Sequence, residues 1–360
     1  MPALHDAFVR HARYYLDVLW EADRLYKEGN AALQRALRLF DREWLNIAAA
    51  QGWIANHINE SDEAAKLCSE YPNAAVYLLS LRIPPRERLH WLRAALDAAL
   101  FLDKREAIAW HTGNLGRVYR ELGDPQRATD CFESVLMKSR EVGDQNSELY
   151  CLSNLASVYS DTGRQKLSID ILSHALTLAE KLGDLREVGG LLGKMGTALS
   201  RSGEHGRALS LYSDQLTIAK ETGDVRSEAE AVNNLGVCYL MLLQYARALE
   251  LLEQAGTLYE TLSDNQHLIA TCNNIGLIYL NTGAYEQGVE TFERQLDLSR
   301  KWENPYGEGR ALYNKALCLD SLNRREEAIV CAVAALEAFK STGSPDLHAA
   351  QATLAKWRQK

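Results

Sequence analysis

Residues 105–144 read REAIAWHTGNLGRVYRELGDPQRATDCFESVLMKSREVGD, and residues 225–264 read VRSEAEAVNNLGVCYLMLLQYARALELLEQAGTLYETLSD. The two segments belong to one series, because the chain superimposes on itself when it is shifted by 40 residues. Six units of this length fill residues 105–344 and begin at Arg105, Gln145, Leu185, Val225, Asn265 and Pro305. A fixed period of this kind predicts an array of equal structural units.

Each unit predicts two helices joined by a tight turn. In the first unit apolar residues recur at helical spacing in two stretches, one around Leu115 and Tyr119 and the other around Phe132 and Val135. A glycine separates the stretches where a left-handed backbone favours a residue without Cβ. These turn glycines are Gly123, Gly163, Gly203 and Gly283. Leu243 takes this place in the fourth unit, which predicts that its first helix runs on or turns differently.

A small residue recurs within the first helix of every unit and predicts close contact between neighbouring helices. These residues are Gly116, Ala156, Gly196, Gly236, Gly276 and Ala316. We therefore expect antiparallel helix pairs stacked in a row.

The pattern Leu-Gly-x-x-Tyr, then Gly, then Ala-x-x-x-Phe resembles the tetratricopeptide repeat. Leu115, Tyr119, Gly123, Ala128 and Phe132 carry it in the first unit. The period resembles the extended form of this repeat found in kinesin light chains, spindle-orientation adaptors and many bacterial regulators. The resemblance implies an all-α, right-handed superhelix (an α-solenoid) whose first helices line a concave surface.

The ends of the chain lie outside the regular period. Residues 1–60 predict an N-terminal cap of two long amphipathic helices, and residues 61–104 predict a degenerate helix pair that is broken near Pro72. Trp20, Trp44, Trp53 and Trp91 are expected to pack within this cap and against the first unit. Residues 345–360 predict a short helix that caps the end of the array.

The N-terminal segment also resembles a known class of signalling protein. Residues 11–16 (HARYYL), 39–47 (LFDREWLNI) and 81–88 (LRIPPRER) are similar to the stretch that joins an NB-ARC-type ATPase to its repeats in bacterial STAND regulators. In that class the repeat arm is thought to sense a ligand and to restrain the ATPase. The resemblance implies a sensing arm, with a separate signalling ATPase as one partner.

Composition excludes several other classes of function. The net charge is −8, which argues against a nucleic acid partner, because such partners favour a basic surface. No apolar stretch approaches the length of a membrane span, and no secretory signal is evident. The seven cysteines form no C-x-x-C pair, so we expect buried thiols in a cytoplasmic protein.

The sequence predicts neither a cofactor nor a catalytic or metal site. Residues 189–194 (GGLLGK) superficially resemble a phosphate-binding loop, but the glycine spacing is wrong and Met195 follows the lysine instead of Ser or Thr. The nine histidines show no spacing typical of zinc ligands. We therefore expect no enzyme.

An amide recurs on the first helices immediately before the Leu-Gly position. Asparagine is a mediocre residue inside a helix, so its recurrence needs an explanation. If the position faces the concave surface, a row of amides is able to pair with the backbone of an extended peptide. This ladder comprises five asparagines and, in the third unit, a lysine: Asn114, Asn154, Lys194, Asn234, Asn274 and Asn314.

Nearby residues vary between units and are candidate specificity contacts. Arginines there suit acidic groups, and aromatic residues suit anchoring side chains. These candidates are Trp110, Arg117, Tyr150, Asn233, Asn273, Arg310 and Tyr313. The alternative is structural: duplication copies residues without selection for binding, and a partly buried asparagine bridges neighbouring repeats.

The sequence therefore favours a non-catalytic protein- or peptide-binding module that uses its concave groove as an adaptor or as a ligand-sensing arm. One alternative is a scaffold that associates with itself through its convex face or its N-terminal cap. A second, less favoured alternative is a nucleotide-dependent switch or an enzyme.

Overall fold

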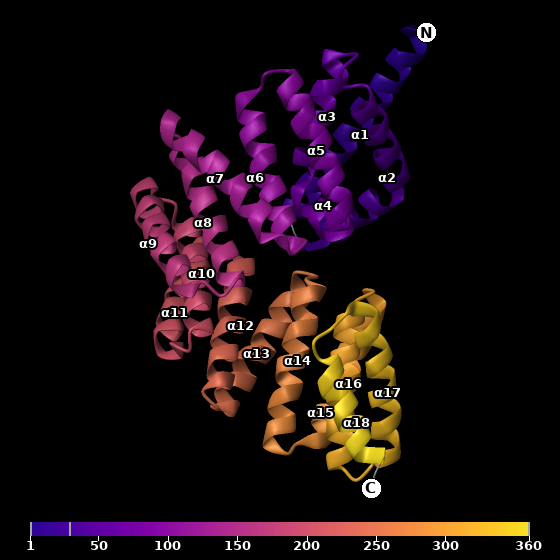
Figure 1. Cartoon of the computed structure of the whole chain (residues 1–360), viewed down its shortest axis with the longest axis vertical. Coiled ribbons are helices and arrows are strands. Elements are labelled where there is room, and N and C mark those ends of the chain that lie inside the picture. Colours follow the sequence, from indigo (N-terminus) through magenta and orange to yellow (C-terminus); the bar gives the residue numbers. More distant parts are fainter. Residues whose placement is uncertain (1, 29, 359–360) are drawn as a thin grey trace. The chain divides into compact units, whose positions relative to one another are not determined.

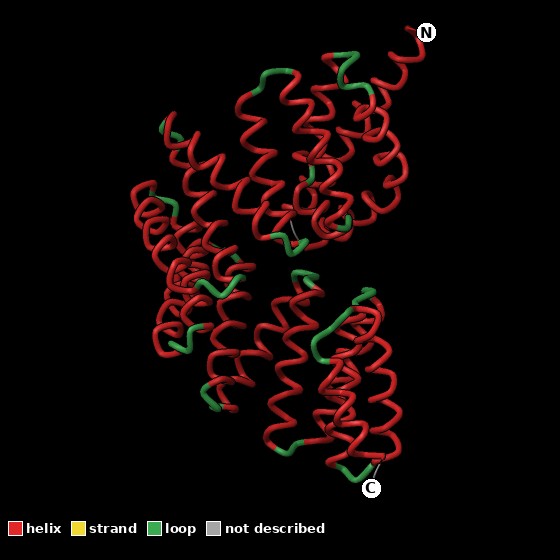
Figure 2. Tube along the Cα trace, viewed as in Figure 1, coloured by secondary structure: helices red, strands yellow, loops and turns green. Residues whose placement is uncertain are grey.

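The computed structural model describes residues 2–28 and 30–358, and within them every regular element is a helix (Figures 1 and 2). Met1 and residues 359–360, the ends of the predicted N- and C-terminal caps, lie outside the described residues, as does residue 29. The chain divides after Leu182 into two compact units. The predicted all-α fold of helix pairs is confirmed.

Unit 1 contains the N-terminal helices and the first two repeats. Its helices are α1 (Pro2–Glu28), α2 (Asn30–Asn56), α3 (Asp62–Ala74), α4 (Val76–Arg82), α5 (Pro85–Phe101), α6 (Arg105–Glu121), α7 (Pro125–Val142), α8 (Gln145–Asp161) and α9 (Gln165–Leu182). The two long helices α1 and α2 pack against each other and against α3, and α5 packs against α6. The N-terminal helices thus join the first repeat through α5.

The segment 61–104 differs from the predicted helix pair because its first arm is divided. Ser61 caps α3 by accepting a hydrogen bond from the backbone N–H of Ala64. Pro72 lies inside α3, and the break comes three residues later at Ala75, whose φ of −149° is not helical. The segment therefore holds three helices, and the short helix α4 lies between α3 and α5 in the sequence.

Aromatic side chains form much of the core beneath the N-terminal helices. Trp44 stacks on Phe40 and on Trp91, at ring distances of 5.5 and 5.7 Å. The buried hydroxyl of Tyr71 donates a hydrogen bond to the carbonyl of Ala12 at 2.7 Å and ties α3 to α1. Trp20 does not join this core, contrary to prediction, because 45% of its surface is exposed.

Unit 2 contains four further helix pairs and a final helix. Its helices are α10 (Leu185–Arg201), α11 (His205–Thr222), α12 (Val225–Met241), α13 (Tyr245–Thr261), α14 (Asn265–Thr282), α15 (Tyr285–Lys301), α16 (Pro305–Ser321), α17 (Arg325–Thr342) and α18 (Leu347–Arg358). First helices of successive pairs contact one another: α10 contacts α12, α12 contacts α14, and α14 contacts α16. In unit 1 the first helices α6 and α8 do the same.

The small residues of the first helices permit the predicted close contacts. A Cβ on Gly116 would lie 2.8 Å from the ring of Phe132, and one on Gly276 would lie 2.5 Å from the ring of Phe292. Each aromatic ring comes from the second helix of the same pair. The missing Cβ therefore makes room for an aromatic ring of that helix.

The fourth unit turns as the others do, so the prediction drawn from Leu243 is wrong. Helix α12 ends at Met241, and Leu243 itself adopts a φ of +58°. Asn323 has a φ of +61° at the same place in the sixth unit. The turn geometry is therefore imposed by the packed helices even where glycine is missing.

Candidate functional site

The most extensive hollow among the described pockets lies in unit 1 and has a volume of about 540 Å³. Helices α1, α3, α4, α6 and α8 all contribute side chains to it. The lining residues are Trp20, Asp23, Lys27, Asn73, Val76, Trp110, Asn114, Arg117 and Tyr150. We call this hollow the unit 1 cavity. Four of the residues predicted as binding contacts thus meet in one place.

Helix α6 supplies three of these side chains because of their spacing. Trp110, Asn114 and Arg117 are separated by four and then three residues, which places them on one face of a helix. Asn114 is buried, whereas 49% of the surface of Trp110 is exposed. The face therefore presents a buried amide between an exposed indole and a half-buried guanidinium.

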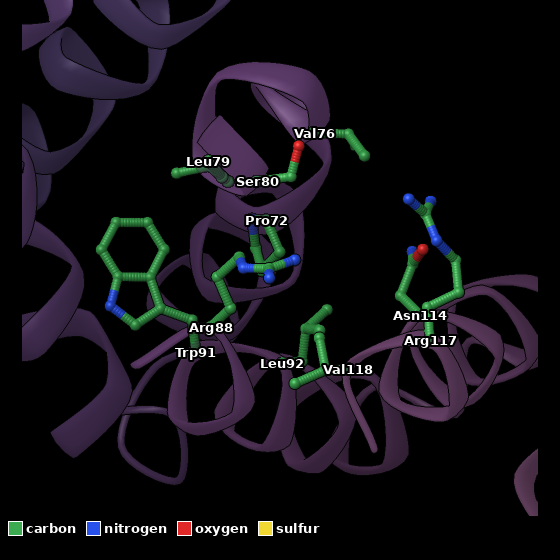
Figure 3. Close-up of a pocket in the computed structure, with 10 residues that line it drawn as sticks. All are labelled: Pro72, Val76, Leu79, Ser80, Arg88, Trp91, Leu92, Asn114, Arg117 and Val118. Carbon is green, nitrogen blue, oxygen red and sulfur yellow. The ribbon is translucent and has the colours of Figure 1, made fainter. Parts of the chain in front are cut away.

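A narrower apolar recess adjoins the unit 1 cavity and shares Val76, Asn114 and Arg117 with it (Figure 3). Pro72, Leu79, Trp91, Leu92 and Val118 provide its apolar lining. In Figure 3 the side chains of Asn114 and Arg117 project from α6 in the same direction. Polar groups that suit a backbone thus lie next to a surface that suits an apolar side chain.

Aromatic rings and polar groups fix the wall of the cavity. Trp110 stacks with Tyr150 at a ring distance of 6.4 Å, and its Nε1 donates a hydrogen bond to Oδ1 of Asn73 at 2.6 Å. Burial raises the pKa of Tyr150 to about 12, against a smaller opposing effect of Arg117. The Tyr150 hydroxyl therefore keeps its proton at neutral pH and is able to donate a hydrogen bond.

Asp23 is the buried acidic residue of the cavity. Only 4% of its surface is exposed, and its Oδ2 forms an ion pair with Nζ of Lys27 at 2.7 Å. Its other oxygen, Oδ1, is buried and has no hydrogen-bond partner among residues 2–28 and 30–358. A carboxylate oxygen left in this state is unusual, because buried polar atoms are nearly always paired.

The six ladder positions are not equivalent, contrary to the uniform row that the sequence predicts. Asn314 is buried, and its Nδ2 donates to Oδ1 of Asn273 on the preceding first helix at 3.1 Å. Asn233 also bridges helices, since its Oδ1 accepts from the hydroxyl of Thr271 at 3.1 Å. At Asn314, Asn273 and Asn233 the structural alternative holds, because each amide forms a hydrogen bond to a neighbouring first helix inside unit 2.

The remaining ladder residues lie in different surroundings. Asn154 donates to the carbonyl of Tyr150 in its own helix at 2.8 Å. Asn234 and Asn274 are half-buried, as is Lys194. The structure records no hydrogen bond for the side chains of Asn234 and Asn274 within the described residues. Peptide contact at these positions stays a prediction.

The two specificity candidates of the sixth unit have internal partners. The guanidinium of Arg310 lies over the ring of Tyr306, 5.7 Å from its centre. The hydroxyl of Tyr313 is 3.0 Å from Oγ1 of Thr353 on α18. Both side chains therefore contribute to packing at the end of unit 2.

Sequence reasoning missed the lining residues outside the repeats. Trp20, Asp23, Lys27, Asn73 and Val76 have no counterparts at the repeat period, so no recurrence marks them. Asp23 interrupts the apolar pattern of α1 at a buried position, and that mismatch was the one available signal.

Two features of the described residues bear on the other function classes. None of the described helices combines the length and apolarity that a membrane crossing demands. Across residues 2–28 and 30–358, no three His, Cys, Asp or Glu side chains are grouped to hold a metal ion.

The family model of the tetratricopeptide repeat matches residues 107–181, 187–261 and 268–341. The chain belongs to the tetratricopeptide repeat family. The predicted family is thereby confirmed, and its first match begins two residues after the predicted start of the array. A comparison with curated proteins found no match.

Several solved structures share the fold of this tetratricopeptide repeat protein. A Rap protein in complex with competence and sporulation factor superimposes with a TM-score of 0.60 at 16% identity, covering 95% of this chain and 98% of that one. The apo form of the quorum sensor NprR from B. thuringiensis gives a TM-score of 0.56 at 18% identity, covering 76% of this chain and 77% of that one.

A STAND protein is also similar. The Signal Transduction ATPase with Numerous Domains that carries a tetratricopeptide repeat sensor in Pyrococcus horikoshii gives a TM-score of 0.58 at 16% identity. The match covers 98% of this chain and 54% of that one. The similarity to the repeat arm of this class, predicted from the N-terminal segment, is thus confirmed at the level of the fold.

Proposed function

We propose that this tetratricopeptide repeat protein binds a short peptide, and that the unit 1 cavity is its binding site. The observation that carries the proposal is the meeting of Trp110, Asn114, Arg117 and Tyr150 in one cavity. Its volume of about 540 Å³ falls in the usual range for sites that bind small molecules. Two proteins of similar fold support a ligand-sensing role, namely the Rap protein complexed with competence and sporulation factor and the quorum sensor NprR.

The chemistry of the wall suits a peptide better than an apolar ligand. An amide such as Asn114 both donates and accepts, so it matches the N–H and C=O groups of a peptide backbone. Arg117 offers several donors in one plane, which suit a carbonyl or a carboxylate. The apolar recess beside them, lined by Leu79 and Trp91, accepts a side chain.

We propose that the module acts by binding alone, as an adaptor or a ligand-sensing arm. Burial raises the pKa of all seven cysteines, so their thiols stay protonated and are poor nucleophiles at neutral pH. His111, which lies near the cavity wall, is fully buried. A separate signalling ATPase is the partner that the STAND likeness supports.

A selection experiment tests the proposed site. The full chain is immobilised and panned with a displayed library of linear hexapeptides, in parallel with the Trp110→Ala/Arg117→Ala variant. We expect enriched peptides to bind the wild type at least about tenfold more tightly than the variant. The Arg164→Ala variant is the matched control. Arg164 is exposed, its guanidinium lies over the ring of Tyr159, and it does not line the unit 1 cavity. Failure of the wild type to enrich any sequence contradicts the proposal.

A further inference from the structure

Asp23 gives the unit 1 cavity a chemical preference that the repeats do not supply. It lies on α1, outside the repeats, and its buried side chain lines the hollow. Its Oδ1 is a buried acceptor with no donor in the part of the chain that the structure describes, and leaving such an atom unpaired destabilises the ligand-free protein. A group that donates to this oxygen would remove that penalty when it binds.

We propose that Asp23 binds a positively charged nitrogen of the ligand, either an α-ammonium group or a Lys or Arg side chain. The inference rests on the proposed function, because it takes the unit 1 cavity as the peptide site. A carboxylate accepts its strongest hydrogen bonds from charged donors, and partial burial strengthens the attraction. The exposed indoles of Trp20 and Trp110 line the same cavity, and indole faces attract cations.

The other charges of the cavity are compatible with this assignment. Lys27 pairs with the opposite oxygen of Asp23 at 2.7 Å, but 60% of its side chain is exposed. Solvent screens an exposed ammonium, so its repulsion of a bound cation is weak. Arg117 lies on α6 and suits a carbonyl or carboxylate of the ligand. A peptide that carries a cationic nitrogen at one end and acceptors further along meets both walls.

The experiment compares Asp23→Asn with Asp17→Asn in the full chain. Asp17 is the matched control, since it is an exposed aspartate of the same helix and does not line the cavity. Hexapeptides enriched on the wild type are synthesised in three forms: unmodified, N-acetylated, and with every Lys and Arg replaced by Gln. We expect Asp23→Asn to weaken the binding of the unmodified peptides about tenfold or more, and Asp17→Asn to leave their affinity unchanged.

The three peptide forms identify the source of the cation. If N-acetylation alone abolishes the difference in affinity between the wild type and Asp23→Asn, the α-ammonium is the partner of Asp23. If replacement of Lys and Arg by Gln alone abolishes that difference, the partner is a Lys or Arg side chain. Lys27→Gln removes the competing cation and should raise the affinity for the unmodified peptides, whereas a lower affinity would count against a cation at Asp23. The melting temperature of Asp23→Asn should stay close to that of the wild type, because Oδ1 has no partner among the described residues and the ion pair lost at Oδ2 is with an exposed lysine.

Two results overturn the inference, and they are distinguishable. If peptides lose affinity for Trp110→Ala/Arg117→Ala but bind Asp23→Asn as well as the wild type, the cavity binds peptides and Asp23 is not a contact. If no peptide is enriched on the wild type, the inference fails together with the proposed function.

Discussion

The ring of Tyr150 packs against the backbone of Gly113, so closely that a Cβ at residue 113 would lie 2.9 Å from Cε1 of the tyrosine. The contact joins the first helices of two successive repeats, and the same ring stacks on Trp110 at the edge of the unit 1 cavity. The absence of one side chain in α6 thus sets the position of a wall residue that belongs to α8.

The Gly113→Ala variant should displace Tyr150 and alter the cavity. We expect a free energy of unfolding lower by about 1 kcal/mol, since crowding a packed site outweighs the gain in helix propensity. Trp110 emission in a chain that retains it as its sole tryptophan should change as the stack opens. Gly190→Ala is the control, because Gly190 lies inside α10 with open space around it. That variant should be more stable by about 0.5–1 kcal/mol.

The glycine–aromatic pairs predict a rescue between two helices. Gly276→Ala should destabilise unit 2 by about 1–3 kcal/mol, because its Cβ would meet Phe292 at 2.5 Å. The second repeat already combines Ala156 with Leu172 at the equivalent positions. Adding Phe292→Leu should therefore recover part of the loss, with a coupling of at least about 0.5 kcal/mol in a double-mutant cycle. Additive effects in urea unfolding would contradict direct packing of this pair.

Removing different amides of unit 2 should change the free energy of unfolding by different amounts. Asn314→Ala leaves Oδ1 of buried Asn273 without its donor and should cost about 1–3 kcal/mol of stability. Asn234→Ala removes a half-buried amide with no recorded hydrogen bond and should change stability by less than about 0.5 kcal/mol. Chemical denaturation of the two variants decides the comparison. Equal losses would show that Asn234 is also a structural bridge.

Buried His111 should make the protein less stable in acid. Burial lowers its pKa from 6.5 to about 4, and its Nε2 lies 2.8 Å from the hydroxyl of Ser69. Between these values the unfolded chain binds a proton that the folded chain does not, so stability present at higher pH is lost as the pH falls. The loss attributable to this residue should be about 2 kcal/mol between about pH 7 and about pH 5.

Urea unfolding at both pH values measures this effect, and His111→Gln is the variant that removes it. The slope of stability against pH should be shallower in His111→Gln than in the wild type. An identical slope in both proteins would mean that other groups carry the acid sensitivity.

The turn at Leu243 should be improved by glycine. Leu243 has a φ of +58°, and 69% of its surface is exposed, so little packing compensates for the strained backbone. Leu243→Gly should raise the free energy of unfolding by about 1 kcal/mol. Gly203→Leu is the reverse substitution at an equivalent turn, where φ is +85°, and should lower it by a similar amount. Thermal unfolding of both variants checks the two signs.

The sequence predicted the repeat array well because helix pairing within it depends on local features. Apolar spacing placed the helices, and the recurring small residues at Gly116 and Gly276 predicted where second helices approach. The prediction from Leu243 was wrong because the identity of the turn residue does not decide where the first helix ends. The packed helices on both sides instead hold that residue in the left-handed region.

The candidate site was predicted only in part. Trp110, Asn114, Arg117 and Tyr150 were found from their places in the repeats, and the structure brings them together. The ladder as a uniform row was not found, because Asn314 and Asn273 bond to each other. The recurrence of an amide predicts its position on the helix. Its hydrogen-bond partner depends on which side chain the neighbouring helix places beside it.

The sequence by itself determined the family, the helix pairs and the face on which Asn114 and Tyr150 lie, because all three follow from spacing within a repeat. Only the tertiary structure placed Asp23 and Trp20 of α1 beside that face. No period relates α1 to α6, so their approach depends on the packing of the N-terminal core, which helices α1 to α5 form. The same packing buries one carboxylate oxygen of Asp23 where none of the described residues donates to it.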